Sequence, residues 1–165
     1  MPKKNRQIIA VPNNSCNGCS DCVEACKQTF QPVSTGNAIS RIKILKTESS
    51  FSPVMCRNCQ DSPCVNTCMT GCITLHENGL IITDYSRCVG CWMCIMSCPF
   101  GAIERDVERH IAVKCNSCPD KEIAPCVAAC ERGVLFQMEM DDFTSQLRKE
   151  SATRFIKGYT KEIKV

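Results

Sequence analysis

The stretch CVGCWMCIMSCP, residues 88–99, decides the architecture of this chain. Its cysteines follow the spacing C-x2-C-x2-C-x3-C, and Pro99 comes directly after the last one. Three thiolates on one tight loop can each reach one iron of a compact four-iron cube, whereas the fourth, about a helical turn further on, points elsewhere. Gly90 lets the backbone pass close to such a cube, and Pro99 ends the short helix after the last cysteine. The stretch therefore predicts a [4Fe–4S] site.

Variants of this pattern occur four times along the chain, and each ends in a C-x3-C step. The spacings are x2, x2, x3 in motif I, x2, x4, x3 in motif II, x2, x2, x3 in motif III and x2, x7, x3 in motif IV. The cysteines are Cys16, Cys19, Cys22 and Cys26 in motif I, Cys56, Cys59, Cys64 and Cys68 in motif II, Cys88, Cys91, Cys94 and Cys98 in motif III, and Cys115, Cys118, Cys126 and Cys130 in motif IV. Gly71, Gly101 and Gly133 follow motifs II to IV at the same offset, which predicts a helix turning back into a strand.

Composition limits the class of protein. The chain has 165 residues, enough for one domain or two fused small ones, and only 5% of them are aromatic. Cysteine is abundant, at 17 residues, which favours a disulfide scaffold or a metal protein. We see no signal peptide, no twin arginine and no run of about 20 apolar residues. We therefore expect a cytoplasmic protein without direct membrane insertion, whose thiols bind metal.

The formal charge gives no reason to expect a nucleic-acid partner. It is +3 when every thiol is counted as neutral. Metal-bound cysteines are thiolates, and four oxidised [4Fe–4S] clusters would contribute about −2 each, which brings the protein to about −5. The basic pI of the free chain is thus no argument for binding an acidic polymer.

Short strands and helices are expected around the motifs. Asn78-Gly79 between two apolar runs is the strongest hairpin signal, and it predicts a hairpin over 72–84. A second hairpin, 101–106 with 110–114, has a turn without glycine. Further expectations are strands at 6–11, 38–45 and 134–138, a loop at 12–15 and a helix near 142–150.

With these spacings the chain resembles the four-cluster iron–sulfur subunits of the dimethyl sulfoxide reductase, formate hydrogenlyase and carbon monoxide dehydrogenase electron-transfer family. The resemblance covers about residues 6–138, and it rests on the x4 gap of motif II, the Cys-Pro end of motif III and the wide gap of motif IV. The segment CVGCWMCIMSCPFGAI is most similar to the ferredoxin-like partner of carbon monoxide dehydrogenase. All four cysteines of motif III are present beside Trp92, so no [3Fe–4S] centre is expected. Motifs I, II and IV depart from the family pattern by lacking a proline after the last cysteine.

The resemblance implies an α+β fold of two interlocked bacterial-ferredoxin-like units, with short hairpins and helices around four [4Fe–4S] clusters. The cluster domain would span 1–140. Its inner unit, from motifs II and III, would span 51–106, and its outer unit, from motifs I and IV, about 6–30 and 107–140. Residues 31–50 would be an insertion and 141–165 a C-terminal arm.

The resemblance also implies that, within each unit, the fourth cysteine of one motif binds the cluster of the other motif. The ligand sets would then be Cys16, Cys19, Cys22 and Cys130; Cys115, Cys118, Cys126 and Cys26; Cys56, Cys59, Cys64 and Cys98; and Cys88, Cys91, Cys94 and Cys68. Spacing alone leaves open a tandem pairing of motif I with II and of III with IV.

Several residues have two readings. Cys72 stands where the motif III copy has Ala102, which favours a small buried residue over a ligand or redox thiol. Trp92 is read as a hydrophobic cover over a cluster rather than an electron relay, and His76 and His110 as structural or surface residues. Five cations beside ligands either are solvated or raise reduction potentials, namely Lys27, Arg57, Arg87, Lys114 and Arg132.

The sequence contains no nucleophile–base constellation, phosphate loop or substrate pocket that we recognise, so we expect an electron-transfer subunit without catalytic residues. Its partners would be a catalytic oxidoreductase subunit, similar to carbon monoxide dehydrogenase, and a downstream electron acceptor. Alternatives are the small subunit of a tungsten aldehyde oxidoreductase, formate dehydrogenase or hydrogenase complex. Outside this class stands a multi-zinc protein, because C-x2-C pairs also bind zinc. A disulfide-rich secreted protein is disfavoured by the expected lack of a signal peptide.

Overall fold

A computed structural model describes the backbone of residues 6–11, 16–30 and 38–162 and the side chains of these residues up to 157. The expected loop 12–15, part of the expected insertion and both chain ends lie outside the described residues. The elements are β1 (Gln7–Ala10), α1 (Asp21–Thr29), β2 (Lys43–Lys46), β3 (Phe51–Val54), α2 (Pro63–Asn66), β4 (Ile73–Leu75), β5 (Ile81–Thr83), a 3-10 turn (Tyr85–Arg87), α3 (Met93–Ser97), β6 (Ile103–Asp106), β7 (Ile111–Lys114), α4 (Pro125–Ala128), β8 (Leu135–Met138) and α5 (Met140–Glu162). Short helices and short hairpins thus confirm the α+β class.

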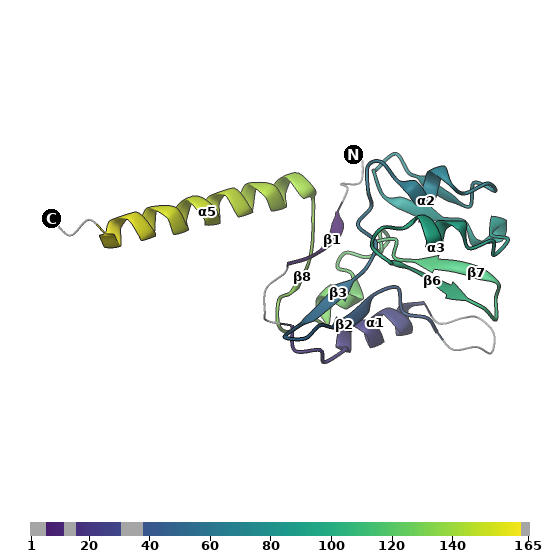
Figure 1. The fold of residues 1–165 in the computed structure, drawn as a ribbon, viewed down its shortest axis with the longest axis horizontal. Coiled ribbons are helices and arrows are strands. Elements are labelled where there is room, and N and C mark those ends of the chain that lie inside the picture. Colours follow the sequence, from purple (N-terminus) through teal and green to yellow (C-terminus); the bar gives the residue numbers. More distant parts are fainter. Residues whose placement is uncertain (1–5, 12–15, 31–37, 163–165) are drawn as a thin grey trace.

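Four two-stranded antiparallel sheets join these elements, in the pairs β1–β8, β2–β3, β4–β5 and β6–β7. The β1–β8 pair places Gln7 opposite Met138, so it connects segments more than a hundred residues apart in the chain. Helix α1 of motif I packs against α4 of motif IV, and α2 of motif II packs against α3 of motif III. Figure 1 accordingly shows β1, β8, α1 and the β2–β3 hairpin on one side of the body and α2, α3, β6 and β7 on the other.

The predicted hairpin over 72–84 is confirmed. Strands β4 and β5 pair with Ile73 opposite Thr83, and Gly79 adopts a φ of 76° in the turn. The amide of Gly79 donates to the carbonyl of His76 at 2.8 Å. Gly79 therefore supplies the left-handed residue of the turn, and Asn78 Oδ1 accepts a hydrogen bond from the amide of Leu80 at 3.1 Å.

The β6–β7 hairpin closes without a glycine by using a buried carboxylate. Asp106 is only 3% exposed, and its Oδ1 accepts from the amide of Arg109 at 2.9 Å. The guanidinium of Arg109 returns to the same carboxylate, with both Nε and an Nη atom 2.5 Å from Oδ2. His110 takes the left-handed position, with a φ of 56°. The Asp106–Arg109 pair thus stabilises this turn, which has no glycine, whereas the β4–β5 turn contains Gly79.

Two elements differ from the sequence expectation. The strand expected over 38–45 begins only at Lys43, and its partner β3, which includes Pro53, was not predicted. Proline is tolerated there because this sheet has only two strands, so each strand has a free edge. Helix α5 is longer than the expected 142–150 and projects from the body (Figure 1). No glycine or proline interrupts residues 140–157, and Asp141 and Asp142 favour its N-terminus.

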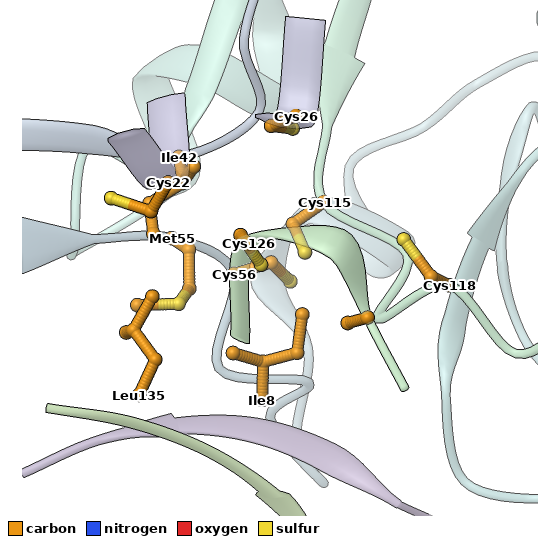
Figure 2. Close-up of a cluster of buried hydrophobic side chains, with 11 residues drawn as sticks. Ile8, Cys22, Cys26, Ile42, Met55, Cys56, Cys115, Cys118, Cys126 and Leu135 are labelled. Atoms are coloured by element: carbon orange, nitrogen blue, oxygen red, sulfur yellow. The ribbon is translucent and has the colours of Figure 1, made fainter. Parts of the chain in front are cut away.

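The core is divided into two clusters in which cysteines alternate with aliphatic side chains. The first contains Ile8, Ile42, Met55 and Leu135 together with cysteines of motifs I, II and IV (Figure 2). The second surrounds Ile81 and Ile103 with Cys72 and Cys94. In both clusters the cysteines thus occupy interior positions that other small domains fill with aromatic side chains.

Among the described helices, none is long and apolar enough to cross a bilayer.

We predict that Asp106→Ala lowers the free energy of unfolding by about 1–3 kcal/mol, because it removes charge-assisted hydrogen bonds that close the β6–β7 turn. Glu108→Ala changes an exposed residue of the same turn and should stay within about 0.5 kcal/mol of the parent protein. Thermal unfolding of the two variants, followed by circular dichroism without oxygen, measures the difference. Equal stabilities would show that the buried carboxylate does not hold the turn.

Candidate metal centres

The four C-x-x-C loops share a left-handed residue at one position. The residue before the second cysteine lies in the left-handed region in every loop, with φ values of 77° at Gly18, 46° at Asn58, 64° at Gly90 and 60° at Ser117. Motifs I and III use glycine there, which adopts this region without strain. Motifs II and IV use asparagine and serine. The chain therefore turns in the same way just before the second cysteine of each motif.

In motifs II and IV this turn directs a backbone amide toward sulfur. The amide of Asn58 donates to Cys56 Sγ at 3.4 Å, and the amide of Ser117 donates to Cys115 Sγ at the same distance. Two fourth cysteines receive similar bonds, Cys26 from the amide of Arg41 at 3.3 Å and Cys130 from that of Val134 at 3.4 Å. Amide donors stabilise thiolates, and at iron–sulfur centres they also raise the reduction potential.

The predicted corner after motifs II to IV is confirmed. Gly71, Gly101 and Gly133 adopt φ values of 60°, 58° and 60°. In each case the glycine amide donates to the carbonyl of the motif's last cysteine, at 3.1 to 3.3 Å. The three corners turn the chain from the helix of each motif into β4, β6 and β8.

Three cavities are each lined by cysteines from two different motifs. The motif I cavity is lined by Cys16, Cys19, Cys22 and Cys130. The motif II cavity is lined by Cys56, Cys59, Cys64 and Cys98. The motif III cavity is lined by Cys68, Cys88, Cys91 and Cys94, and also by Cys72. Apart from Cys72, each cavity takes three thiols from one motif and one from the fourth position of another.

The remaining thiols, Cys26, Cys115, Cys118 and Cys126, form the motif IV group inside the first core cluster (Figure 2). Burial raises the pKa of Cys118 to about 12, and repulsion from Cys115 and Cys26 adds to the shift. The pKa of Cys126 is raised as well, first by burial and then by repulsion from the same two neighbours. Three of the four predicted ligand sets thus each line one cavity, and the fourth set lies in the first core cluster, which also contains Cys22 and Cys56.

Electrostatic coupling also crosses between motifs. Burial raises the pKa of Cys22 to about 11, and the strongest thiol neighbour is Cys130, ahead of Cys19 of the same motif. Burial likewise raises the pKa of Cys94 to about 11, with repulsion from Cys88 and Cys68 next. These free thiols are neutral at pH 7, so a metal that binds them as thiolates must displace their protons.

Cys72 is buried, as expected, but the sequence did not predict its position at the motif III cavity. It is 2% exposed, lines the motif III cavity and shares a side-chain hydrogen bond with Cys88. Burial raises its pKa to about 12. Comparison with Ala102 in the repeat correctly indicated a small buried side chain, but only the folded chain brings this fifth thiol to the cavity.

Trp92 forms part of the wall of the motif III cavity. Its ring meets that of His110 edge-to-face, with centroids 5.3 Å apart, and the guanidinium of Arg105 lies 5.8 Å from the Trp92 ring. His110 also lies directly above Gly90, where a Cβ atom would come within 2.5 Å of the His110 carbonyl oxygen. His110 therefore packs against both Trp92 and Gly90 of the motif III loop.

Motifs II and IV are joined by a buried polar contact that the sequence did not reveal. The side-chain amide of Asn58 donates to Ser117 Oγ at 2.9 Å, and its oxygen accepts from the amide of Ile81 at the same distance. Lys114 Nζ donates to the carbonyls of Ile81 and Cys115 at 2.5 and 2.7 Å. The two halves of the protein meet at this contact.

The donor set suits a four-iron cube, which takes one thiolate at each iron. Among the side chains that the structure describes, no three of His, Cys, Asp or Glu converge closely enough to hold a single metal ion. Four thiols per group, from loops that also offer amide donors to sulfur, are the ligands and surroundings that iron–sulfur clusters use.

Comparison with known proteins gives a consistent picture. A family model described as a 4Fe-4S dicluster domain matches residues 47–142. The chain is 36% identical over 146 residues to YsaA of Escherichia coli (strain K12), covering 83% of this chain and 92% of that protein. It is 30% identical over 176 residues to the electron transport protein HydN of the same organism, covering 92% and 99%. It is 31% identical over 151 residues to the thiosulfate reductase electron transfer subunit PhsB of Salmonella typhi, covering 84% and 78%.

We predict that Gly90→Ala disrupts the motif III centre whereas Gly101→Ala does not. Both glycines have a φ near 60°, so alanine costs about 1–2 kcal/mol of backbone strain at either position. At Gly90 the new methyl group would also collide with the His110 backbone, but at Gly101 it meets no atom within 4 Å. Iron content and the unfolding midpoint of the two variants test this. A Gly101→Ala protein as damaged as Gly90→Ala would contradict it.

Proposed function

The chain belongs to the 4Fe–4S dicluster domain family, and from this membership we propose that it relays single electrons through four [4Fe–4S] clusters. Its place would be between a catalytic oxidoreductase subunit and a downstream acceptor. Two relatives support the role: HydN is named an electron transport protein and PhsB an electron transfer subunit of thiosulfate reductase. The observation that carries the proposal is that three cavities are each lined by four motif cysteines drawn from two different motifs.

In this proposal each group of four thiols holds one cluster. The three cavities and the motif IV group match the ligand sets implied by the family, in which the fourth cysteine of one motif serves the other motif of its unit. The packing of α1 against α4 and of α2 against α3 supports the same pairing. The inner unit then spans 51–106, and the outer unit spans 6–30 and 107–140.

The order of the four groups along the protein follows from their thiol neighbours. Charge repulsion from Cys64 of the motif II cavity helps to raise the pKa of Cys94 in the motif III cavity. Repulsion from Cys56 of the motif II cavity helps to raise the pKa of Cys115 in the motif IV group. Repulsion from Cys22 of the motif I cavity helps to raise the pKa of Cys126 in the motif IV group. These neighbours support the order III–II–IV–I, in which each group lies near the next.

The ends of this order supply the points of entry and exit. Cys91 of the motif III cavity and Cys19 of the motif I cavity are exposed, whereas Cys115, Cys118 and Cys126 in the middle are buried. A donor and an acceptor would thus approach the groups at opposite ends of this order. The similarity of residues 88–103 to the partner of carbon monoxide dehydrogenase makes that enzyme our first candidate for the catalytic subunit. The tungsten aldehyde oxidoreductase, formate dehydrogenase and hydrogenase complexes are the other candidates.

The first test of the proposal is metal content. Protein purified without oxygen should contain about sixteen iron and sixteen sulfide per chain, because four complete thiol groups are available. Metal analysis by mass spectrometry, with colorimetric sulfide determination, measures both. Fewer than about twelve irons in fully reconstituted protein would refute four clusters. Zinc in place of iron in freshly isolated protein would favour the multi-zinc alternative.

A second test separates the nested pairing of motifs from the tandem one. Cys26→Ala should remove a ligand of the motif IV group and leave the motif I cavity complete, and Cys130→Ala should do the reverse. Tandem pairing would instead make Cys26 a ligand of the motif II cluster. Anomalous iron density and paramagnetic spectra of the two variants distinguish these cases.

Cys72→Ala is the matched control for this second test, since it removes a buried cysteine that no ligand set contains. The variant should keep about sixteen irons.

Loss of the motif II cluster in Cys26→Ala would exclude the nested arrangement.

A further inference from the structure

Lys114 is a buried cation without a carboxylate partner among the described residues. It is the last residue of β7 and comes just before Cys115. The side chain is 1% exposed, and Nζ donates to the carbonyl oxygens of Ile81 and Cys115. None of the ion pairs found among the described side chains includes it. An ammonium group held away from water needs a compensating negative charge nearby.

Two neighbouring groups of cysteines can supply that charge, once they bind metal as thiolates. Burial raises the pKa of Cys64, in the motif II cavity, and of Cys115, in the motif IV group, and the Lys114 ammonium acts in the opposite direction on both. Its hydrogen bonds tie β5 of the inner unit to the motif IV loop of the outer unit. The Asn58–Ser117 bond closes the same junction. Lys114 thus lies between the two groups through which the two units meet.

We propose that Lys114 is a fixed buried counter-charge at this junction, which stabilises the reduced states of the motif II and motif IV clusters. The inference rests on the proposed function. Reduction of either cluster adds one electron and one unit of negative charge, and no bond is formed or broken. A nearby positive charge lowers the energy of the more negative state, and in the interior neither salt nor water screens it well. Lys114 therefore keeps the crossing between the units accessible to the electron.

The other cations beside ligands do not share this environment. The Lys27 side chain follows Cys26, is 43% exposed and lies 3.8 Å from the Glu24 carboxylate. The guanidinium of Arg57 lies over the Phe100 ring at 4.4 Å. Solvent and a neighbouring carboxylate weaken the field of Lys27 at sulfur. Lys27 is therefore the natural control for a charge that is adjacent in sequence but exposed.

The test uses the complete chain with its clusters and compares Lys114→Met, Lys114→Gln and Lys114→Arg with Lys27→Met. Redox titrations followed by paramagnetic resonance give the midpoint potential of each cluster. We expect both neutral variants at 114 to make the reduction of two of the four clusters about tenfold less favourable. For a one-electron couple this lowers the midpoint potential by about 59 mV. Lys114→Arg should retain most of the parent potentials, and Lys27→Met should shift them by less than a third as much.

Each outcome decides the question. Full iron content with unchanged potentials in Lys114→Met and Lys114→Gln would overturn the proposal and leave the relay function standing. An equal shift of all four clusters would overturn it too, since the charge would then not act at the junction. If the neutral variants bind no iron but Lys114→Arg does, the positive charge is required for the centres to form. This result would support the electrostatic pairing of Lys114 with the two clusters. If Lys114→Arg also fails, the side chain acts through its shape, and the proposal is wrong.

Discussion

The fold depends on one geometric constraint: the fourth cysteine of a motif lies four residues beyond the third, about 6 Å along a helix, and this is too far for it to face the cavity that its own first three cysteines line. Cys130, Cys98 and Cys68 accordingly line the cavities of motifs I, II and III rather than those of their own motifs. Every complete group of four therefore needs two segments of chain. The long-range β1–β8 pair and the packing of α1 on α4 bring those segments together on the outer side.

The same constraint explains the composition of the core. The buried aliphatic residues, such as Ile8, Ile42, Ile81 and Ile103, surround cysteines instead of each other, and the sheets have only two strands each. Two-stranded sheets are marginal in water unless another layer covers them. Burial also raises the pKa of Cys115 and Cys118, which keeps them neutral as free thiols. Metal binding would replace these protons with covalent cross-links between segments, so folding and metal binding become one process.

Local signals in the sequence were sufficient for the motifs, the corner glycines and the Asn78-Gly79 hairpin, because spacing and φ preference act within a few residues. Local patterns do not predict burial or strand pairing that depends on contacts with a distant segment of the chain. The IAVK strand ends in Lys114, and a charged residue at a strand end is ordinarily exposed. Its burial comes from β5, which lies about thirty residues earlier in the chain. The pairing of β2 with the proline-containing β3 depends likewise on contacts that no local pattern records.

The loops that lack glycine show how the two units are joined. A left-handed residue other than glycine carries backbone strain, smaller for asparagine because its side chain can bond locally. Gly18 and Gly90 avoid that strain where Phe51 and His110 leave no room for a Cβ atom. Asn58 and Ser117 accept it at the equivalent positions, and their side chains bond to each other between motifs II and IV. Glycine at either position would relieve the strain but remove this bond. Of the four left-handed residues that precede the second cysteine of a motif, the two that are not glycine therefore face each other across the junction, next to the buried charge of Lys114.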